Sequence, residues 1–252
     1  MNDLRAVLMQ DGGITMYIVF FSLLLIYFTV ICVWDYRDTK KKKDLAVTEN
    51  EKCKGYGQSI MALWGATLAV FIMCFIGGIG LEEIGFRQIS FNYGFWFTAV
   101  TLSISGLFFA YLLYALISLL VPKFRESQSK QAVGGVTKYL PRSKKAKWLF
   151  SLLALSAGVC EEIIFRGFFL FLFFAIFPNA PVYLVVLIPI LLFGIGHAYQ
   201  GLQGIMGTAL LGAFFICLYL VTDSLIFPIL LHFLNDLIGA FMVSDEDINT
   251  TE

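Results

Sequence analysis

The fold is decided by residues 148–177, which read WLFSLLALSAGVCEEIIFRGFFLFLFFAIF. A helix needs about 20 apolar residues to cross the hydrocarbon core of a bilayer, and this run exceeds that length. Unlike an ordinary membrane span, it carries Glu161, Glu162 and Arg166 near its middle. Because ionisable groups at membrane depth are costly unless they are paired or hydrated, these three residues are functional candidates.

The rest of the chain has the composition of a membrane protein. Of its 252 residues, 59% are hydrophobic and only 14% are charged, whereas a soluble globular protein carries about 25% charged residues. We therefore predict an all-α fold, a polytopic helix bundle in the cell membrane with about seven transmembrane helices (roughly six to eight). Besides residues 148–177, the expected spans are residues 14–34, 57–80, 95–121, 181–199, 201–222 and 224–243.

The chain divides into three predicted parts. Residues 1–147 hold N-terminal membrane helices with basic cytoplasmic loops, residues 148–243 form the helical core, and residues 244–252 form an acidic tail. No soluble domain is expected, because the longest polar stretch, residues 123–147, is too short to bury a core. The five cysteines are scattered singly, so neither a disulfide framework nor a thiolate zinc site is indicated.

The basic residues predict the orientation in the membrane. Of the 18 lysines and arginines, seven lie in residues 37–54 and eight in residues 123–147. Placing both loops in the cytoplasm puts the N-terminus outside and the C-terminus inside. The lysine run at residues 40–43 is interpreted as a topology anchor that also binds anionic membrane lipid, and no nucleic-acid partner is expected.

The predicted core holds few ionisable groups. Its 96 residues carry five formal charges, together with both histidines of the chain. Glu162 and Arg166 are i,i+4 neighbours and can pair, whereas Glu161 is rotated by about 100° and stays free for chemistry. The alternative is a structural ion pair beside a protonated second glutamate. Asp223 is set aside, because it lies in a predicted turn where a solvated carboxylate is ordinary.

Two further polar groups lie on the fifth and seventh predicted spans. Phe193 precedes His197 by one helical turn and can pack against one side of its ring. His232 shares a helix face with Asn235 and Asp236. Each group alone also fits a structural interpretation. His197 can be an interfacial histidine whose hydrogen bonds are made, and the His232 group can be a polar contact between helices. Three such groups on three helices favour one shared polar cavity.

Such a cavity has the parts for amide hydrolysis without a covalent intermediate. A glutamate beside a histidine can activate water, and a second histidine can stabilise the developing oxyanion. Glu161, His197 and His232 are also candidate ligands for a divalent metal such as zinc, so the cofactor is either such a metal or none. The zincin motif HExxH and the nucleophile elbow GxSxG are absent.

Three ordered motifs resemble those of the CPBP intramembrane proteases, the CAAX-processing and bacteriocin-processing enzymes that are often described as metalloproteases. The resemblance covers about residues 148–243. The motifs are Glu161-Glu162-x-x-x-Arg166 followed by Gly167, Phe193-x-x-x-His197, and His232-x-x-x-Asp236.

The resemblance implies a role for each motif residue. Glu161 would activate the water with His197 as its partner, Glu162 and Arg166 would support the site, and His232 and Asp236 would bind the oxyanion. The family often has asparagine at the last position, and an ionised aspartate would repel an oxyanion. Asp236 would therefore be protonated, orient His232, or yield the donor role to Asn235.

The predicted function is that of an intramembrane endopeptidase. Its substrate would be a membrane-associated peptide or protein, either prenylated and CAAX-like or leader-bearing. The alternatives are a non-catalytic membrane scaffold or bacteriocin-immunity protein, and a proton-coupled transporter. Glu82, Glu83 and Arg87 repeat the EExxxR spacing with no histidine nearby in sequence, and we interpret this repeat as an interfacial helix end.

Overall fold

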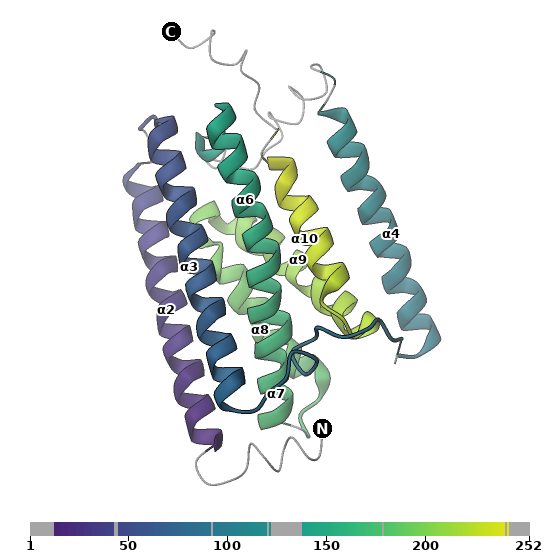
Figure 1. The fold of residues 1–252 in the computed structure, drawn as a ribbon. Coiled ribbons are helices and arrows are strands. Elements are labelled where there is room, and N and C mark those ends of the chain that lie inside the picture. Colours follow the sequence, from purple (N-terminus) through teal and green to yellow (C-terminus); the bar gives the residue numbers. More distant parts are fainter. Residues whose placement is uncertain are drawn as a thin grey trace.

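The computed structural model describes residues 13–42, 45–91, 93–119, 121, 138–177, 179–239 and 241. These residues form helices and connecting turns without any strand, which confirms the predicted all-α bundle (Figure 1). The elements are α2 Gly13–Lys41, α3 Glu49–Ile76, α4 Phe95–Ser118, α6 Lys144–Glu161, the π-helix η2 Glu162–Phe169, α7 Leu170–Ile176, α8 Val182–Gly196, the 3-10 turn η3 Ala198–Gln200, α9 Gly201–Thr222 and α10 Ile226–Gly239.

Several helices are long and apolar enough to cross a membrane. Within the described residues these are Thr15–Lys41, Glu49–Ile76, Phe95–Ser118 and Ala198–Thr222, and two shorter apolar helices accompany them at Val182–Gly196 and Ile226–Ile238. Large apolar side chains remain exposed on the outer faces of the bundle, as at Phe75, which is 87% exposed. Such a surface suits lipid, so the protein is a membrane protein.

The α3 helix begins and ends earlier than its apolar run suggested. It starts at Glu49 because Thr48 and Glu51 form a capping box, in which each side chain bonds the backbone N–H of the other residue. It ends at Ile76 because Gly77 and Gly78 follow, and Gly78 has φ +64°, a left-handed conformation that glycine adopts without strain. Polar capping thus extends a membrane helix beyond the apolar window at one end.

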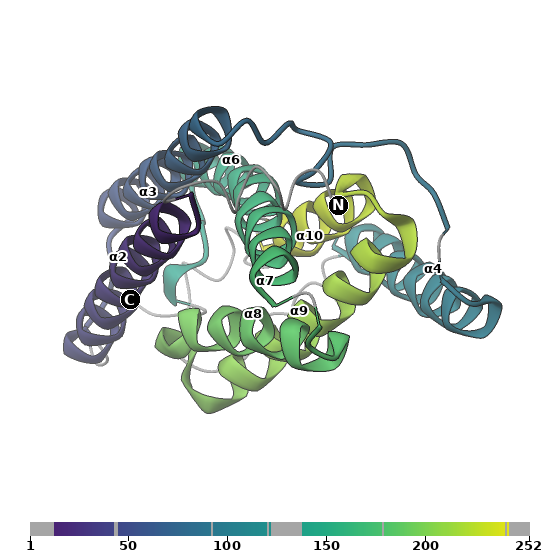
Figure 2. The same ribbon diagram turned by 90° about the horizontal axis from the view of Figure 1, so that it is seen from below.

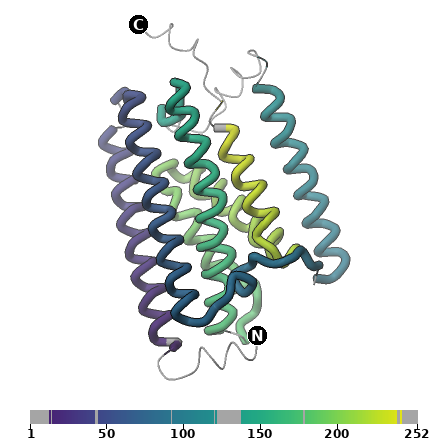
Figure 3. Tube along the Cα trace, viewed as in Figure 1, coloured from purple at the N-terminus to yellow at the C-terminus, as the bar shows by residue number. Residues whose placement is uncertain are grey.

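The helices pack in an order that places α6 at the centre. α6 contacts α3 on one side and α10 on the other, and α8 packs along α9. The view along the bundle shows α2 and α3 on one flank and α4 as the outermost helix on the other, against α9 and α10 (Figure 2). The tube representation shows the connection between α3 and α4 at the end of the bundle opposite to the one where α2 ends and α6 begins (Figure 3).

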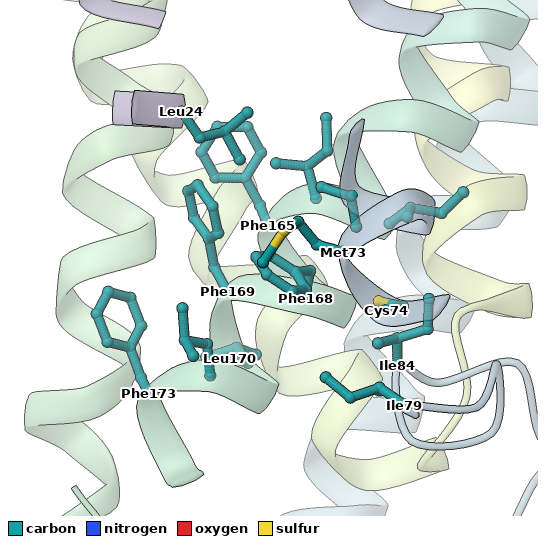
Figure 4. Close-up of a cluster of buried hydrophobic side chains, with 14 of the residues drawn as sticks. Leu24, Met73, Cys74, Ile79, Ile84, Phe165, Phe168, Phe169, Leu170 and Phe173 are labelled. Carbon is teal, nitrogen blue, oxygen red and sulfur yellow. The ribbon is translucent and has the colours of Figure 1, made fainter. Parts of the chain in front are cut away.

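An aromatic core lies below α6, where η2 and α7 continue the same helix. Phe165, Phe168, Phe169 and Phe173 pack among side chains of α2 and α3, including Leu24 (Figure 4). The rings meet mostly edge to face, with centroids 4.9–5.7 Å apart for the pairs that join α2 to this core, an arrangement that stabilises beyond the buried area alone. This packing fixes the depth and rotation of η2.

A glycine lets α6 approach α10 closely. A Cβ atom added at Gly158 would lie 2.9 Å from the backbone nitrogen of Phe233, closer than real Cβ contacts allow. Small residues at such crossings are how membrane helices bring their backbones together. Since Phe233 follows His232 directly, this crossing carries the histidine of α10 to the glutamates that end α6.

Two predictions remain untested. The division of the chain at residues 147 and 243 and the orientation of the two termini stay predictions. Residues 1–12 and the predicted acidic tail, 244–252, lie outside the described residues, as do residues 123–137 of the basic stretch at 123–147.

Candidate active site

The two adjacent glutamates lie where the helix changes its winding. Glu161 is the last residue of α6, and Glu162 opens η2, a π-helix that runs to Phe169. Wide π-turns are rare and are frequent at functional sites. Every residue of η2 is buried, so the widened turn lies inside the bundle. The helical periodicity of the sequence did not predict this change.

Glu162 and Arg166 form a fully buried ion pair. Glu162 Oε1 lies 3.0 Å from Arg166 Nη1, and the two side chains are 0% and 1% exposed. The pair has the i,i+4 spacing that the sequence analysis anticipated. The same carboxylate oxygen lies 2.8 Å from Nδ1 of His232. Glu162 therefore joins Arg166 of η2 to His232 of α10.

His232 is surrounded by carboxylates. Its Nδ1 donates a hydrogen bond to Glu162 Oε1, because an ionised carboxylate can only accept one. Its Nε2 lies 3.7 Å from Glu161 Oε2 and 3.5 Å from Asp236 Oδ2. The imidazole is 3% exposed, so these contacts form away from bulk solvent. The structure thus brings His232 together with both glutamates and with Asp236.

Asp236 contacts two of its neighbours on the α10 helix. Its Oδ2 faces the His232 ring, and its Oδ1 accepts a hydrogen bond of 3.1 Å from Asn235 Nδ2. The side chain is about one-third exposed. Asp236 and Asn235 are thus engaged with each other as well as with the site.

Glu161 is the carboxylate that the buried ion pair leaves free. Its Oε2 is buried and has no hydrogen-bond partner among the described residues, although its side chain as a whole is 17% exposed. Buried polar atoms are nearly always satisfied by protein or by water. An unsatisfied oxygen on a partly exposed carboxylate is therefore a place where water or a substrate group would bind.

His197 lies at the end of α8, on the other side of the Phe193 ring. Its Nδ1 lies 2.9 Å from the carbonyl oxygen of Phe193, and since a carbonyl only accepts, Nδ1 carries the proton and Nε2 keeps a lone pair. The Phe193 ring centroid lies 5.0 Å from His197 and 6.0 Å from His232. His197 is also close enough to Glu161 and Asp236 for a coulombic interaction with each.

Sequence reasoning missed two polar residues at this site. Tyr199 of η3 lies near Glu161 and Asp236, with its ring 6.1 Å from His197. Asp35 of α2 is near His197, and the Cys32 thiol, one turn before it, donates to the Ile195 carbonyl at 3.2 Å. The only sequence signal for Asp35 is its position directly after the first predicted span, residues 14–34.

Sequence reasoning also assigned no role to α9, which contacts the site through Gly212 and Phe215. The Gly212 carbonyl oxygen accepts from Arg166 Nη2 at 3.4 Å, and Phe215 stacks on His232. Neither residue is ionisable, and no motif marks either of them. Their contacts arise only when α9 packs against η2 and α10.

The candidate metal ligands do not form a ready metal site. A zinc ion would require donor atoms about 2.0–2.2 Å from it. Within the described part of the chain, no group of three or more His, Cys, Asp or Glu side chains is placed to hold a metal ion. Of the candidates, Glu161 Oε2 and His232 Nε2 are 3.7 Å apart, but His197 does not complete a set with them.

The second EExxxR motif is not part of this site, although a Cβ atom added at Gly167 would lie 2.6 Å from the Ile84 carbonyl oxygen. Residues 82–87 form turns rather than a helix, and Arg87 pairs with the Asp223 carboxylate while its Nε donates to the Asp223 carbonyl at 2.8 Å. The interpretation as a helix end is therefore wrong in detail, because the helix has already ended at Ile76. The repeat ties the α3–α4 connection to the turn between α9 and α10.

Comparison with known proteins identifies a protease family over the segment that holds this site. Residues 143–238 match the family model described as Type II CAAX prenyl endopeptidase Rce1-like. No curated protein and no solved structure matches the chain. The matched segment begins just before α6 and ends within α10, so it contains all three motifs.

Proposed function

We propose that this chain, whose residues 143–238 match the model of the Rce1-like Type II CAAX prenyl endopeptidases, is an intramembrane protease that hydrolyses a peptide bond with water activated by Glu161 and His197. The observation that carries this mechanism is that the two adjacent glutamates have different contacts and different exposure. Glu162 pairs through Oε1 with Arg166 and His232 and its side chain is 0% exposed. Each glutamate has one oxygen without a hydrogen-bond partner among the described residues, but only Glu161, with a side chain that is 17% exposed, can present that oxygen to water. Environments that separate two carboxylates in this way are how proteins assign them different roles.

In the proposed reaction Glu161 takes a proton from the water as the oxygen attacks the carbonyl carbon of the substrate. His197 accepts a hydrogen bond from the same water through its Nε2 lone pair. The tetrahedral intermediate collapses when the carbon–nitrogen bond breaks, and Glu161 returns the proton to the leaving nitrogen. One water and one amide thus yield one carboxylic acid and one amine, and transfer of the remaining water proton from the acid to the amine gives a carboxylate and an ammonium, without a covalent enzyme intermediate.

His232 is the proposed donor to the oxyanion. Donation from Nε2 requires a proton on that nitrogen while Nδ1 holds its own proton toward Glu162, so the ring acts as an imidazolium. Asp236 supports this state, since its carboxylate lies 3.5 Å from Nε2. Of the three roles left open for Asp236, we therefore favour the one in which it orients His232 and keeps it protonated.

The substrate class is the part of the proposal that cleavage assays test directly. The purified protein in lipid vesicles is given a membrane peptide that ends in a prenylated CAAX-like sequence, the same peptide without the lipid, and a leader-bearing peptide. We expect cleavage of the prenylated peptide, on the order of tenfold faster than of its unlipidated form, because the lipid holds the peptide at the membrane. Mass spectrometry identifies the cleaved bond. Absence of any product with all three peptides would sink the proposal.

Removal of metal tests the proposed route to water activation. Because the candidate donors do not converge, we expect cleavage to persist after exhaustive chelation, with only substoichiometric metal left in the active protein. Elemental analysis and the cleavage rate are measured on the same sample. Loss of activity on chelation and its recovery with zinc would contradict the mechanism but leave the peptidase assignment standing.

A further inference from the structure

We propose that Phe215 of α9 is a positioning residue that holds the His232 imidazole at the angle the site requires, an inference that rests on the proposed function. The two rings are stacked, with centroids 5.3 Å apart and planes inclined by 23°. Phe215 is 0% exposed and His232 is 3% exposed. The two flat rings therefore pack against each other inside the bundle, away from solvent.

Phe215 touches both partners of Glu162. The Arg166 guanidinium carbon lies 5.6 Å from the centre of the Phe215 ring and 4.3 Å from that of Phe193. A guanidinium lies favourably over an aromatic face, and more so where water is excluded. Phe215 and Phe193 thus bracket the arginine, while Phe215 also supports the histidine.

The neighbouring turn of α9 is shaped for the same arginine. Gly212 lies three residues before Phe215, on the same helix face, and its carbonyl accepts from Arg166 Nη2. A Cβ atom at Gly212 would lie 3.0 Å from Phe193 Cδ1 and 3.3 Å from Arg166 Nη2. The missing side chain leaves the space that Arg166 and the Phe193 ring occupy.

The stack on Phe215 restrains the tilt of the His232 ring, which the hydrogen bond to Glu162 leaves free. The bond from Nδ1 to Glu162 fixes one edge of the imidazole, but a ring held at one edge can still tilt about that bond. The Phe215 face limits this tilt and keeps Nε2 directed toward Glu161 and Asp236. Leucine at position 215 would fill much of the volume without offering a flat face.

The test compares Phe215→Leu with Phe214→Leu. Phe214 is the adjacent phenylalanine of α9, and its ring packs 5.2 Å from Phe108 of α4 and 5.4 Å from Phe215 itself. It therefore controls for the loss of an aromatic ring beside Phe215 while the stack of Phe215 on His232 is kept. For Phe215→Leu we expect kcat to fall by about 10–100-fold with KM within about twofold, since a small misplacement of a reacting group costs this much. For Phe214→Leu we expect both constants to stay within about twofold. Equal effects of the two variants on kcat would overturn the proposal.

Histidine NMR tests the same inference without relying on activity. Because the chain has only two histidines, ¹⁵N-histidine labelling yields two ring systems, and His197→Gln assigns them. We expect Phe215→Leu to lose the slowly exchanging Nδ1–H signal of His232 and to retain that of His197, while Phe214→Leu keeps both. An unchanged His232 signal in Phe215→Leu overturns the positioning role. If Phe215→Leu loses the His232 signal but the unsubstituted protein cleaves no peptide, the positioning role stands and the proposed function is rejected.

Discussion

Replacing Glu161 by glutamine is expected to lower kcat by roughly a thousandfold while leaving the free energy of unfolding nearly unchanged. Glutamine keeps the size of the side chain but cannot take a proton from water. The change removes no hydrogen bond from Glu161 Oε2, which has no hydrogen-bond partner among the described residues. It does remove the long ion pair of 3.7 Å with His232 Nε2, but Glu162 and Asp236 remain as closer carboxylate partners of His232. The cleavage rate and an unfolding titration in detergent measure the two quantities.

The chain contains a matched control for this variant. Glu82 occupies the same position in the second EExxxR motif, and its side chain is exposed in a turn away from the site. We expect Glu82→Gln to retain the full cleavage rate. A Glu161→Gln protein that cleaves as fast as the Glu82→Gln protein would reject Glu161 as the base and would favour a non-catalytic scaffold or a transporter.

The second large effect is expected on stability. Replacing Arg166 by methionine leaves the Glu162 carboxylate buried without its cation, and breaking a buried pair from one side costs about 3–5 kcal/mol. Arg166 also loses its contacts with Phe193 and Gly212. We expect the free energy of unfolding to fall by that amount. We also expect cleavage to be lost, because Glu162 no longer holds His232 in one place.

Arg87→Met provides the comparison for this prediction. Arg87 also pairs with an aspartate, but its side chain is 36% exposed, and pairs near the surface contribute about 0–1 kcal/mol. The two arginines occupy the same position of the same motif, so burial is the main difference between them. Equal destabilisation by the two substitutions would contradict the view that Arg166 belongs to a buried network.

The two EExxxR motifs also show how far local sequence determines local structure. Residues 161–166 and 82–87 differ within the motif mainly at one position, where Ile164 is replaced by Gly85. Gly85 has φ +98°, and an added Cβ there would lie 2.7 Å from the Tyr219 ring. The first motif is helical and buried, whereas the second is a turn held by Asp223. Glycine before and within the second motif was the signal that its helix had ended.

Residues close in sequence were paired correctly because helical periodicity places them on one face. The contact between Glu162 and Arg166 and the approach of Asp236 to His232 both have i,i+4 spacing. The prediction that Glu161 stays outside the ion pair follows from the same geometry. The change to a π-helix at Glu162 was not predictable in this way, since its residues have ordinary helical patterning and the widening depends on how η2 packs.

The amino-acid sequence by itself determined that this protein is a helical membrane bundle, and which few charges lie in its apolar core, because burial in lipid depends on composition and helix length. Only the tertiary structure decided that His232 binds Glu162, that Asp35 and Tyr199 lie near His197, and that Phe215 stacks on His232. These residues are brought together by close helix crossings such as that at Gly158. Such contacts depend on side-chain shape across helices, which periodicity along one helix does not specify.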